Sequence, residues 1–305
     1  MKHSVRTLLS GLIDYAGLFP PASLDMRTAA LNYGEYLKSD EAWILGRFIV
    51  PVSRLEEFED ATADLLPTGN PVLPWKLSAL INPETKSDPD EDLNLIADFN
   101  YVHAVDELAG AAVVDTLEMP IRAVEDIRQA RRALPRTMAC YLEVPAGRRT
   151  YEMISSTARS GAMVKVRTGG VREDTIPTSA ELAQFIKTCA GERVAFKATA
   201  GMHHALRGKH PLTYEANSPA GNMHGFLNVF LAACFARFGM EETDVRALLE
   251  ETSIDAFGFE DEVITWRSHE LTESRIYVAR QQFAMSYGSC SFDEPIAELK
   301  SLGLI

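Results

Sequence analysis

Eight short apolar runs that alternate with stretches of helical periodicity constrain the fold more than any other feature of this sequence. Short apolar runs are typical of buried strands, whereas apolar residues at helical spacing predict amphipathic helices. The runs span residues 12–19, 42–50, 75–81, 111–118, 138–144, 162–168, 193–200 and 284–291. The helical stretches include residues 26–39, 122–134 and 178–189. This alternation predicts an α/β fold, a single (β/α)8 TIM barrel.

One domain over residues 1–305 is expected, because the chain holds no Gly/Ser-rich or Pro-rich linker and 305 residues suit one barrel. The segment between the seventh and eighth runs is longer than one barrel helix requires. We expect an elaboration over residues 205–283, with helices near 225–238 and 243–251 and a hairpin near 257–268. Residues 83–94 are polar and contain proline, which predicts a surface loop.

The net charge indicates which partners the protein is not expected to bind, and the cysteines indicate its redox environment. A net charge of −13 argues against nucleic acid and anionic membranes as partners. The four cysteines are widely spaced without a CxxC pair, which favours reduced thiols. The N-terminal apolar run is too short for a signal peptide, and we expect a cytoplasmic protein. The stretch 227–238 is apolar nearly all round, which indicates either deep burial or a homo-oligomer interface.

Two cations interrupt a predicted buried strand in the stretch VKVRTGG, residues 164–170. Lys165 and Arg167 are two positions apart, so their side chains point to the same face, and burial of unpaired cations is costly. Lys197 occupies the matching position on the next strand. Neighbouring strands lie roughly 4.8 Å apart, so the two lysines can approach closely. This pattern favours catalysis or anion binding; outward side chains, or ion pairs with acids such as Glu143, are the structural alternative.

A like charge and desolvation both lower the pKa of a lysine, and a neutral lysine can form a Schiff base with a carbonyl compound. The sequence therefore suggests that Lys197 lowers the pKa of Lys165. Proton transfer would need a carboxylate, and Asp115 and Asp14 are the candidates within the strands. The alternatives are a salt bridge for Asp115 and a cap or turn role for Asp14.

These residues resemble the deoxyribose-phosphate aldolases, a family of class I aldolases built on a (β/α)8 barrel. The family's Schiff-base lysine lies in a Lys-x-x-Thr-Gly motif, which is similar to residues 165–169. Its second lysine lies in a Phe-Lys-x-x-x-Gly motif, which is similar to residues 196–201. The resemblance is strongest over residues 110–202. It implies a Schiff-base role for Lys165 and a supporting role for Lys197, with no cofactor.

Shorter segments carry the resemblance further. Asp115 falls where the family has its proton-relay aspartate, and Asp14 lies in a stretch, 13–23, similar to the family's N-terminal motif. Residues 142–145, 177–186 and 287–291 are similar to the family's fifth strand, sixth helix and last strand. Thr199 and Ser289, which lie within matching segments, are expected to bind substrate.

The chain also departs from the family pattern. Arg167 stands where the family has a small residue, and the sequence continues past Gly201 with Met-His-His. Acids at 293 and 294 follow the last strand, where a barrel usually holds phosphate. We therefore expect a small anionic carbonyl substrate other than deoxyribose 5-phosphate, with Arg167 on its anion.

Arg47, His203 and His204 complete the expected substrate-binding residues. Arg47 is a cation within an apolar run, and an outward ion pair is its alternative. The adjacent histidines could ligate a metal, but no metal-binding spacing supports that reading, so no metal is expected.

The preferred function is a class I aldolase-type lyase. Two rivals stay open: a related barrel enzyme without a Schiff base, such as an isomerase or metal-assisted lyase, and a non-catalytic anion-binding protein.

Overall fold

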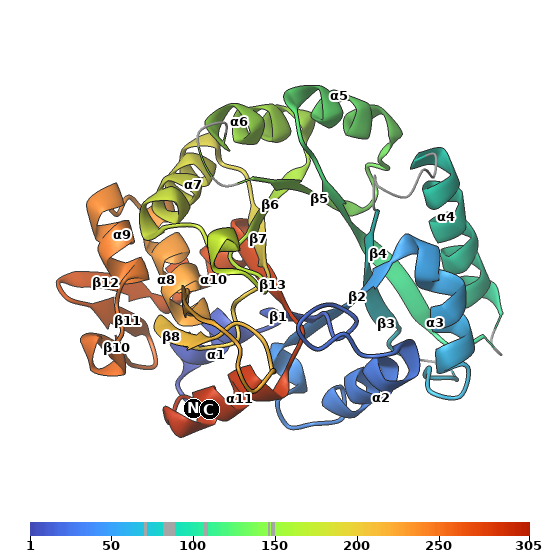
Figure 1. Cartoon of the computed structure of the whole chain (residues 1–305), viewed down its shortest axis with the longest axis horizontal. Helices are drawn as coiled ribbons and strands as arrows, with labels where there is room; N and C mark the ends of the chain where they lie inside the picture. The colour runs from blue at the N-terminus through green and yellow to red at the C-terminus, as the bar shows by residue number, and fades with distance from the viewer. Residues whose placement is uncertain (70–71, 82–88, 107–108, 146, 148–149) are drawn as a thin grey trace.

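The computed structural model describes residues 1–69, 72–81, 89–106, 109–145, 147 and 150–305. Eight parallel strands close into a barrel in the order β1-β13-β7-β6-β5-β4-β3-β2 (Figure 1). They are β1 (Ile13–Tyr15), β2 (Leu45–Pro51), β3 (Trp75–Leu80), β4 (Ala112–Pro120), β5 (Ala139–Val144), β6 (Met163–Arg167), β7 (Phe196–Thr199) and β13 (Ala284–Ser289). Each overlaps one of the eight predicted runs, so the predicted (β/α)8 barrel is confirmed.

Helices alternate with the strands and surround them (Figure 1). They are α2 (Met26–Tyr36), α3 (Leu55–Thr62), α4 (Pro89–Val105), α5 (Val124–Ala133), α6 (Thr150–Ser160), α7 (Ser179–Glu192), α8 (Phe226–Arg237), α10 (Glu273–Gln282) and α11 (Asp293–Ser301). The capping box that begins α7 is formed as its sequence indicates: Thr178 Oγ1 accepts from the Glu181 amide, and the Glu181 carboxylate accepts from the Thr178 amide.

The loop predicted over 83–94 is corrected in its second half. Residues 82–88 lie outside the described residues, but the chain is helical from Pro89 onward in α4. Proline at the first helical position and acids in the first turn both favour a helix start, because the free amides there carry partial positive charge. Asp90, Glu91 and Asp92 supply those acids. Polarity and proline therefore marked a helix N-terminus here rather than the interior of a loop.

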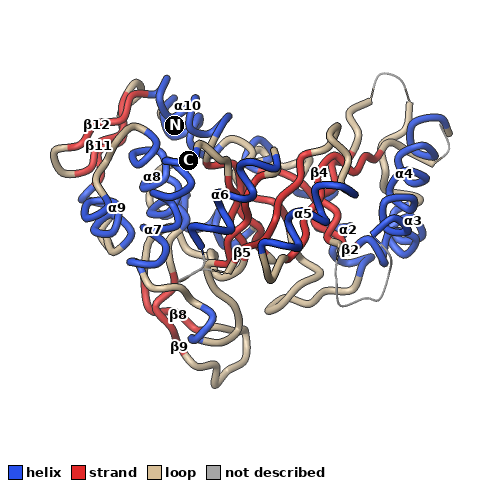
Figure 2. The backbone as a smooth tube through the Cα atoms, turned by 90° about the horizontal axis from the view of Figure 1, so that it is seen from above, coloured by secondary structure: helices blue, strands red, loops and turns tan. Residues whose placement is uncertain are grey.

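The elaboration between β7 and β13 holds two small sheets besides its helices. β8 (Gly208–Pro211) and β9 (Ala220–Met223) form an antiparallel pair, and α9 (Glu242–Leu249) follows α8. β10 (Phe257–Phe259), β11 (Val263–Trp266) and β12 (His269–Thr272) form a three-stranded antiparallel sheet. Figure 2 shows the two sheets projecting from different sides of the molecule. The expected helices and hairpin are present, whereas β12 and the pair β8–β9 had no counterpart in the prediction.

Helix α8 is buried inside the chain itself. Every residue from 226 to 236 is buried. Its polar residue Asn228 is fully hydrogen-bonded: Nδ2 donates to the carbonyls of Leu248 and Glu251, each at 2.8 Å, and Oδ1 accepts from the Arg207 amide at 2.9 Å. Burial within one chain therefore explains why this helix is apolar all round, without a partner subunit. Within the described part of the chain, none of the helices has both the length and the apolar character needed to cross a bilayer.

Arg280 on α10 joins the N-terminal helix α1 (His3–Leu9) to the last barrel strand. Its guanidinium donates to the carbonyl oxygens of Leu8 at 2.8 Å and Ser10 at 3.0 Å, and also to those of Ala284 and Met285. Burial lowers the pKa of this guanidinium to about 10. A single buried side chain thus satisfies four backbone acceptors from two segments that are far apart in the sequence.

We predict that Arg280→Lys lowers the free energy of unfolding by about 2–3 kcal/mol, because an ammonium cannot reach all of these buried carbonyls. Urea unfolding followed by circular dichroism measures the change. Arg275→Lys, an exposed change on the same helix, is the control and should cost under about 0.5 kcal/mol. Equal losses in the two variants would contradict the account.

Candidate functional site

A cavity of about 320 Å³ opens at the C-terminal end of the barrel. Its polar lining consists chiefly of Glu118, Glu143, Lys165, Arg167, Thr199, His203 and Cys290, and its apolar lining includes Phe19, Ile49 and Leu80. These residues come from the ends of the barrel strands and the loops that follow them, which is where barrel enzymes carry their chemistry. The volume suits a small molecule.

The two lysines lie side by side as the sequence predicts. Lys165 on β6 pairs in register with Lys197 on β7, and both side chains are buried inside the barrel. Lys165 lines the cavity, whereas Lys197 is completely enclosed and lies outside the cavity lining. The amine of Lys197 also lies 5.5 Å from the centre of the Tyr141 ring, within the range of a cation–π contact. A substrate in the cavity can therefore reach the amine of Lys165 first.

Glu118, at the C-terminal end of β4, joins the two lysines. One carboxylate oxygen lies 2.5 Å from Lys197 Nζ and accepts from Ser78 Oγ at 2.6 Å. The other lies 2.8 Å from Lys165 Nζ. The Glu118 side chain is buried as deeply as the lysines. Charges buried this far from water are stable only when paired, and Glu118 pairs with both cations at once.

Two further carboxylates complete the cluster. Asp14 on β1 lies 2.7 Å from Lys197 Nζ and accepts from Ser286 Oγ at 2.7 Å. Glu143 on β5 lies 2.9 Å from Lys165 Nζ and 3.3 Å from the guanidinium of Arg167. Three carboxylates, Asp14, Glu118 and Glu143, thus face three cations, Lys165, Lys197 and Arg167. We call these six residues the charge cluster.

The charge cluster keeps both lysines protonated, contrary to the expected lowering of the Lys165 pKa. Burial lowers the pKa of Lys165, but Glu118 and Glu143 outweigh it and hold the pKa above its ordinary value. Lys197 opposes them with a smaller effect, in the direction that the sequence suggested. Burial also lowers the pKa of Lys197, but Asp14 and Glu118 outweigh it, so this pKa is raised as well. The ion pair of Lys165 with Glu143, which the sequence analysis gave as the structural alternative to a reactive lysine, is present.

The glycines after the lysine motif allow strands β6 and β7 to approach at their ends. A Cβ atom on Gly169 would lie 2.8 Å from the Cα of Gly201, which is closer than such contacts occur. Gly201 itself has φ +72°, a left-handed conformation that favours glycine. Thr168 Oγ1 donates to the Ala200 carbonyl at 2.7 Å across the same junction. The two glycines thus hold the lysine-bearing strands in register beside the cavity.

Asp115 and Arg47 do not reach the cavity lining. They pair with each other, with Arg47 Nη2 3.0 Å from Asp115 Oδ2, and each side chain is about 30% exposed. The salt-bridge alternative for Asp115 is therefore what the structure has, although its partner is Arg47. Asp14 holds this pair near the charge cluster, because its second carboxylate oxygen accepts from the Arg47 amide at 2.7 Å. Glu118, rather than Asp115, is the carboxylate of β4 that contacts the two lysines.

The remaining expected binding residues divide into two groups. Thr199, His203 and Arg167 line the cavity. His204 and Ser289 are outside its lining: His204 Nδ1 lies 2.5 Å from a Glu298 oxygen, and Ser289 Oγ donates to the Ser291 carbonyl at 2.6 Å. Substrate binding therefore stays a prediction for the first group, whereas the side chains of the second group are engaged with other residues.

The acids after the last strand have partners of their own. Glu294 lies 2.9 Å from His203 Nδ1, and Asp293 accepts from the Tyr36 hydroxyl at 2.7 Å. In the part of the chain that the structure describes, no group of three or more His, Cys, Asp or Glu side chains is arranged to hold a metal ion.

Sequence reasoning missed Glu118 and Cys290 as site residues. Glu118 closes the fourth predicted run, and Cys290 lies in the eighth. Their positions at strand C-termini were the available signal, since those ends form the rim of the cavity.

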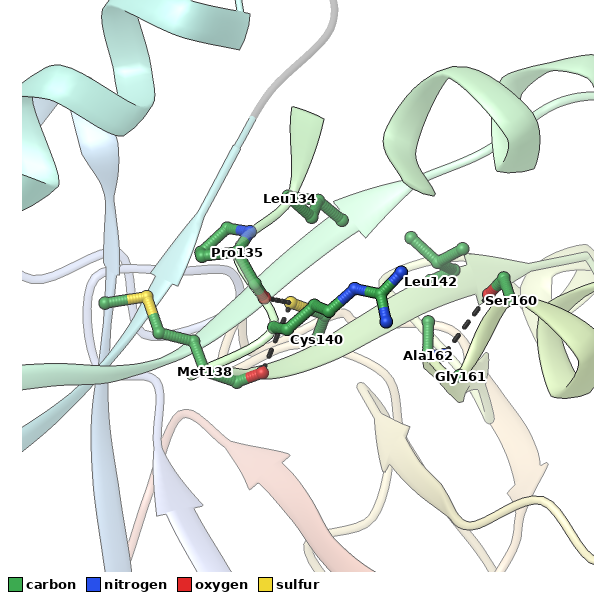
Figure 3. Close-up of a pocket in the computed structure, with 9 residues that line it drawn as sticks. Leu134, Pro135, Met138, Cys140, Leu142, Ser160, Gly161 and Ala162 are labelled. Carbon is green, nitrogen blue, oxygen red and sulfur yellow. Dashed lines mark hydrogen bonds between the residues drawn. The ribbon is translucent and has the colours of Figure 1, made fainter. Parts of the chain in front are cut away.

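A second cavity lies at the other end of β5, where Cys140 and Leu142 line it with Leu134, Pro135 and Met138 (Figure 3). Its lining is about equally polar and apolar and includes Arg136 and Ser160, and the Cys140 thiol donates to the backbone carbonyls of Pro135 and Met138. It holds none of the charge cluster, so the chemistry concentrates in the C-terminal cavity.

Searches for similar proteins give no family: no protein-family model matches the chain, and no curated protein matches it. The barrel is a fold typical of enzymes, and its activity has to be argued from the site.

We predict that Glu118→Gln lowers the free energy of unfolding by about 3–5 kcal/mol at pH 7, because it leaves two buried ammonium groups with one carboxylate fewer. Glu57→Gln breaks an exposed pair with Arg54 and is the control, at under about 1 kcal/mol. Urea unfolding measures both.

The deficit of Glu118→Gln should narrow between pH 7 and pH 10. In the wild type both lysine pKa values are raised, so the buried ion pairs persist until high pH. Without Glu118 the lysine pKa values fall, and the buried amines of the variant lose their protons at a lower pH. The cost of burying an incompletely paired ammonium group then disappears, and the variant regains stability relative to the wild type. A deficit that is constant with pH would contradict this electrostatic account.

Proposed function

We propose that this protein is a class I, Schiff-base lyase of the aldolase type that acts on a small anionic carbonyl compound. The observation that carries the proposal is the position of Lys165, whose amine faces the cavity between two carboxylates. Either Glu118 at 2.8 Å or Glu143 at 2.9 Å is close enough to take its proton. The enzyme-typical barrel and the two lysine motifs support the same reading.

In the proposed reaction, neutral Lys165 forms a bond from nitrogen to the carbonyl carbon, and the carbonyl oxygen leaves as water after protonation. The protonated imine then accepts the electron pair of the neighbouring carbon–carbon bond as that bond breaks. A carboxylate takes the proton of the β-hydroxyl group, so an aldehyde leaves and an enamine remains on Lys165. Protonation of the enamine carbon and hydrolysis of the imine release the second product.

Arg167 is the proposed anion-binding residue. Its side chain is 51% exposed and lines the cavity, and its pair with Glu143 is long at 3.3 Å. A guanidinium can form paired hydrogen bonds with a carboxylate or a phosphate, which would orient the substrate carbonyl toward Lys165.

Borohydride trapping tests the proposal. Incubation with glyoxylate, pyruvate or small sugar phosphates followed by borohydride should reduce an imine to a stable secondary amine on Lys165, which peptide mass spectrometry locates. Lys165→Met should abolish the adduct, and Lys76→Met, a change at an exposed lysine of β3, should retain it. An adduct on Lys197 alone would transfer the nucleophile role, and no adduct from any carbonyl compound would refute the Schiff base.

The rate of imine formation should rise about tenfold per pH unit between pH 7 and pH 9, because Lys165 has a raised pKa and the proton that Glu118 or Glu143 takes from it has to be released to solvent before the amine attacks. Samples incubated at each pH and then quenched with borohydride under one fixed condition give the rate. A rate that does not change over this range would contradict release to solvent and would mean either that the proton stays on a carboxylate of the charge cluster during attack or that the Lys165 pKa lies well below its ordinary value.

Anion binding without an imine is the second candidate function, since the exposed guanidinium of Arg167 on the cavity can bind an anion whether or not Lys165 reacts. Thermal stabilisation by glycolate equal to that by glyoxylate, with no reducible adduct, would favour it. Stabilisation specific to the carbonyl compound would favour the lyase.

A further inference from the structure

Cys290 lies on the same cavity as Lys165, directly after the last barrel strand β13. The thiol has an imidazole within reach: Cys290 Sγ lies 3.9 Å from His203 Nε2, a length acceptable for a sulfur hydrogen bond. The other imidazole nitrogen, Nδ1, lies 2.9 Å from a Glu294 oxygen. Thiol, imidazole and carboxylate therefore stand in sequence, as in enzymes that activate a nucleophile through a base and an orienting acid.

Three different segments supply this triad. Cys290 follows β13, His203 follows β7, and Glu294 lies in the first turn of α11. The pairing between β7 and β13 brings the first two together, because these strands are neighbours in the barrel. The geometry thus depends on the closed barrel, and each member sits on or beside a rigid element.

Cys290 differs from the other cysteines in its surroundings. Cys189 and Cys234 are fully enclosed, and burial raises the pKa of both thiols. Cys140 lines the separate cavity at the other end of β5. Cys290 alone of the four lines the cavity that holds Lys165.

The groups around His203 make it a stronger base than an ordinary imidazole. Burial lowers the pKa of His203, but its contacts with Cys290 and Glu294 outweigh this and raise the pKa to about 9. A tyrosine also faces the thiol, since the Tyr214 hydroxyl lies 3.8 Å from Sγ. A raised pKa makes the imidazole better able to take a proton from the thiol that it contacts.

We propose that Cys290 is a second nucleophile of this cavity, with His203 as its base and Glu294 as the residue that positions the imidazole, and that it adds to the aldehyde partner of the reaction. His203 takes the thiol proton as the sulfur forms a bond to the aldehyde carbon; the carbonyl π electrons move to oxygen, and the oxygen then takes that proton from His203. The product is a neutral hemithioacetal, and no oxidant or reductant is needed. The identity of the electrophile as an aldehyde rests on the proposed lyase function; the reactivity of the thiol does not.

Competitive alkylation tests the nucleophile. With limiting iodoacetamide at pH 7, peptide mass spectrometry should show Cys290 modified at least about tenfold faster than Cys140. His203→Gln should slow the reaction about tenfold, and Glu294→Gln, a half-exposed position that leaves the core intact, about threefold. His269→Gln, on β12 away from the cavity, is the matched control and should leave the rate unchanged. Equal rates at Cys290 and Cys140, or no effect of either triad variant, would overturn the proposal.

Protection in the Lys165→Met variant tests the aldehyde adduct separately from the imine. Glyoxylate and acetaldehyde should slow alkylation of Cys290 at least about fivefold more than their alcohol counterparts, glycolate and ethanol, which can occupy the cavity but cannot form a hemithioacetal. Equal protection by aldehyde and alcohol, or no protection by either, overturns the adduct. Because this variant cannot form the Lys165 imine, its result stands apart from the borohydride experiment, and either proposal can fail without the other.

Discussion

The contact of Glu118 with both Lys165 and Lys197 is the interaction on which the barrel interior depends. Each ammonium group loses its hydration on burial, and an unpaired ion in such a place costs several kcal/mol. One carboxylate at 2.8 Å and 2.5 Å from the two amines offsets that cost for both. The contact also links β4 with β6 and β7, so electrostatic compensation and strand packing require the same geometry.

The same compensation sets a problem for catalysis. Carboxylates that make the buried lysines tolerable also favour their protonated forms, and a protonated amine is not a nucleophile. A Schiff-base reaction at this site has to begin with transfer of a proton from Lys165 to an acid that is itself held below its ordinary pKa. The ion pairs that stabilise buried Lys165 therefore retain the proton that this amine has to lose before it can react.

Much of this architecture could be predicted from the sequence, because the governing patterns are local. Apolar runs indicate strands, and two lysines at matching strand positions indicate neighbours in a parallel sheet. The choice between Asp115 and Glu118 could not be predicted in this way. The pairing of β3 with β4 shifts register beside Asp115, since Leu77 pairs with Val114 and Ser78 with Thr116. Such an irregularity changes which face each following side chain occupies, and no local pattern announces it.

The triad of Cys290, His203 and Glu294 shows the same limit at longer range, since 87 positions separate the thiol from the imidazole. Only the closure of the barrel, with β13 between β1 and β7, brings them together. That closure places a thiol and an amine on one small cavity. An aldol reaction has two carbonyl partners, one activated as an imine and enamine and the other an aldehyde. In the proposed reaction Cys290 would hold the aldehyde as a hemithioacetal beside the Lys165 enamine, and the free carbonyl has to re-form from that adduct before the carbon–carbon bond is made.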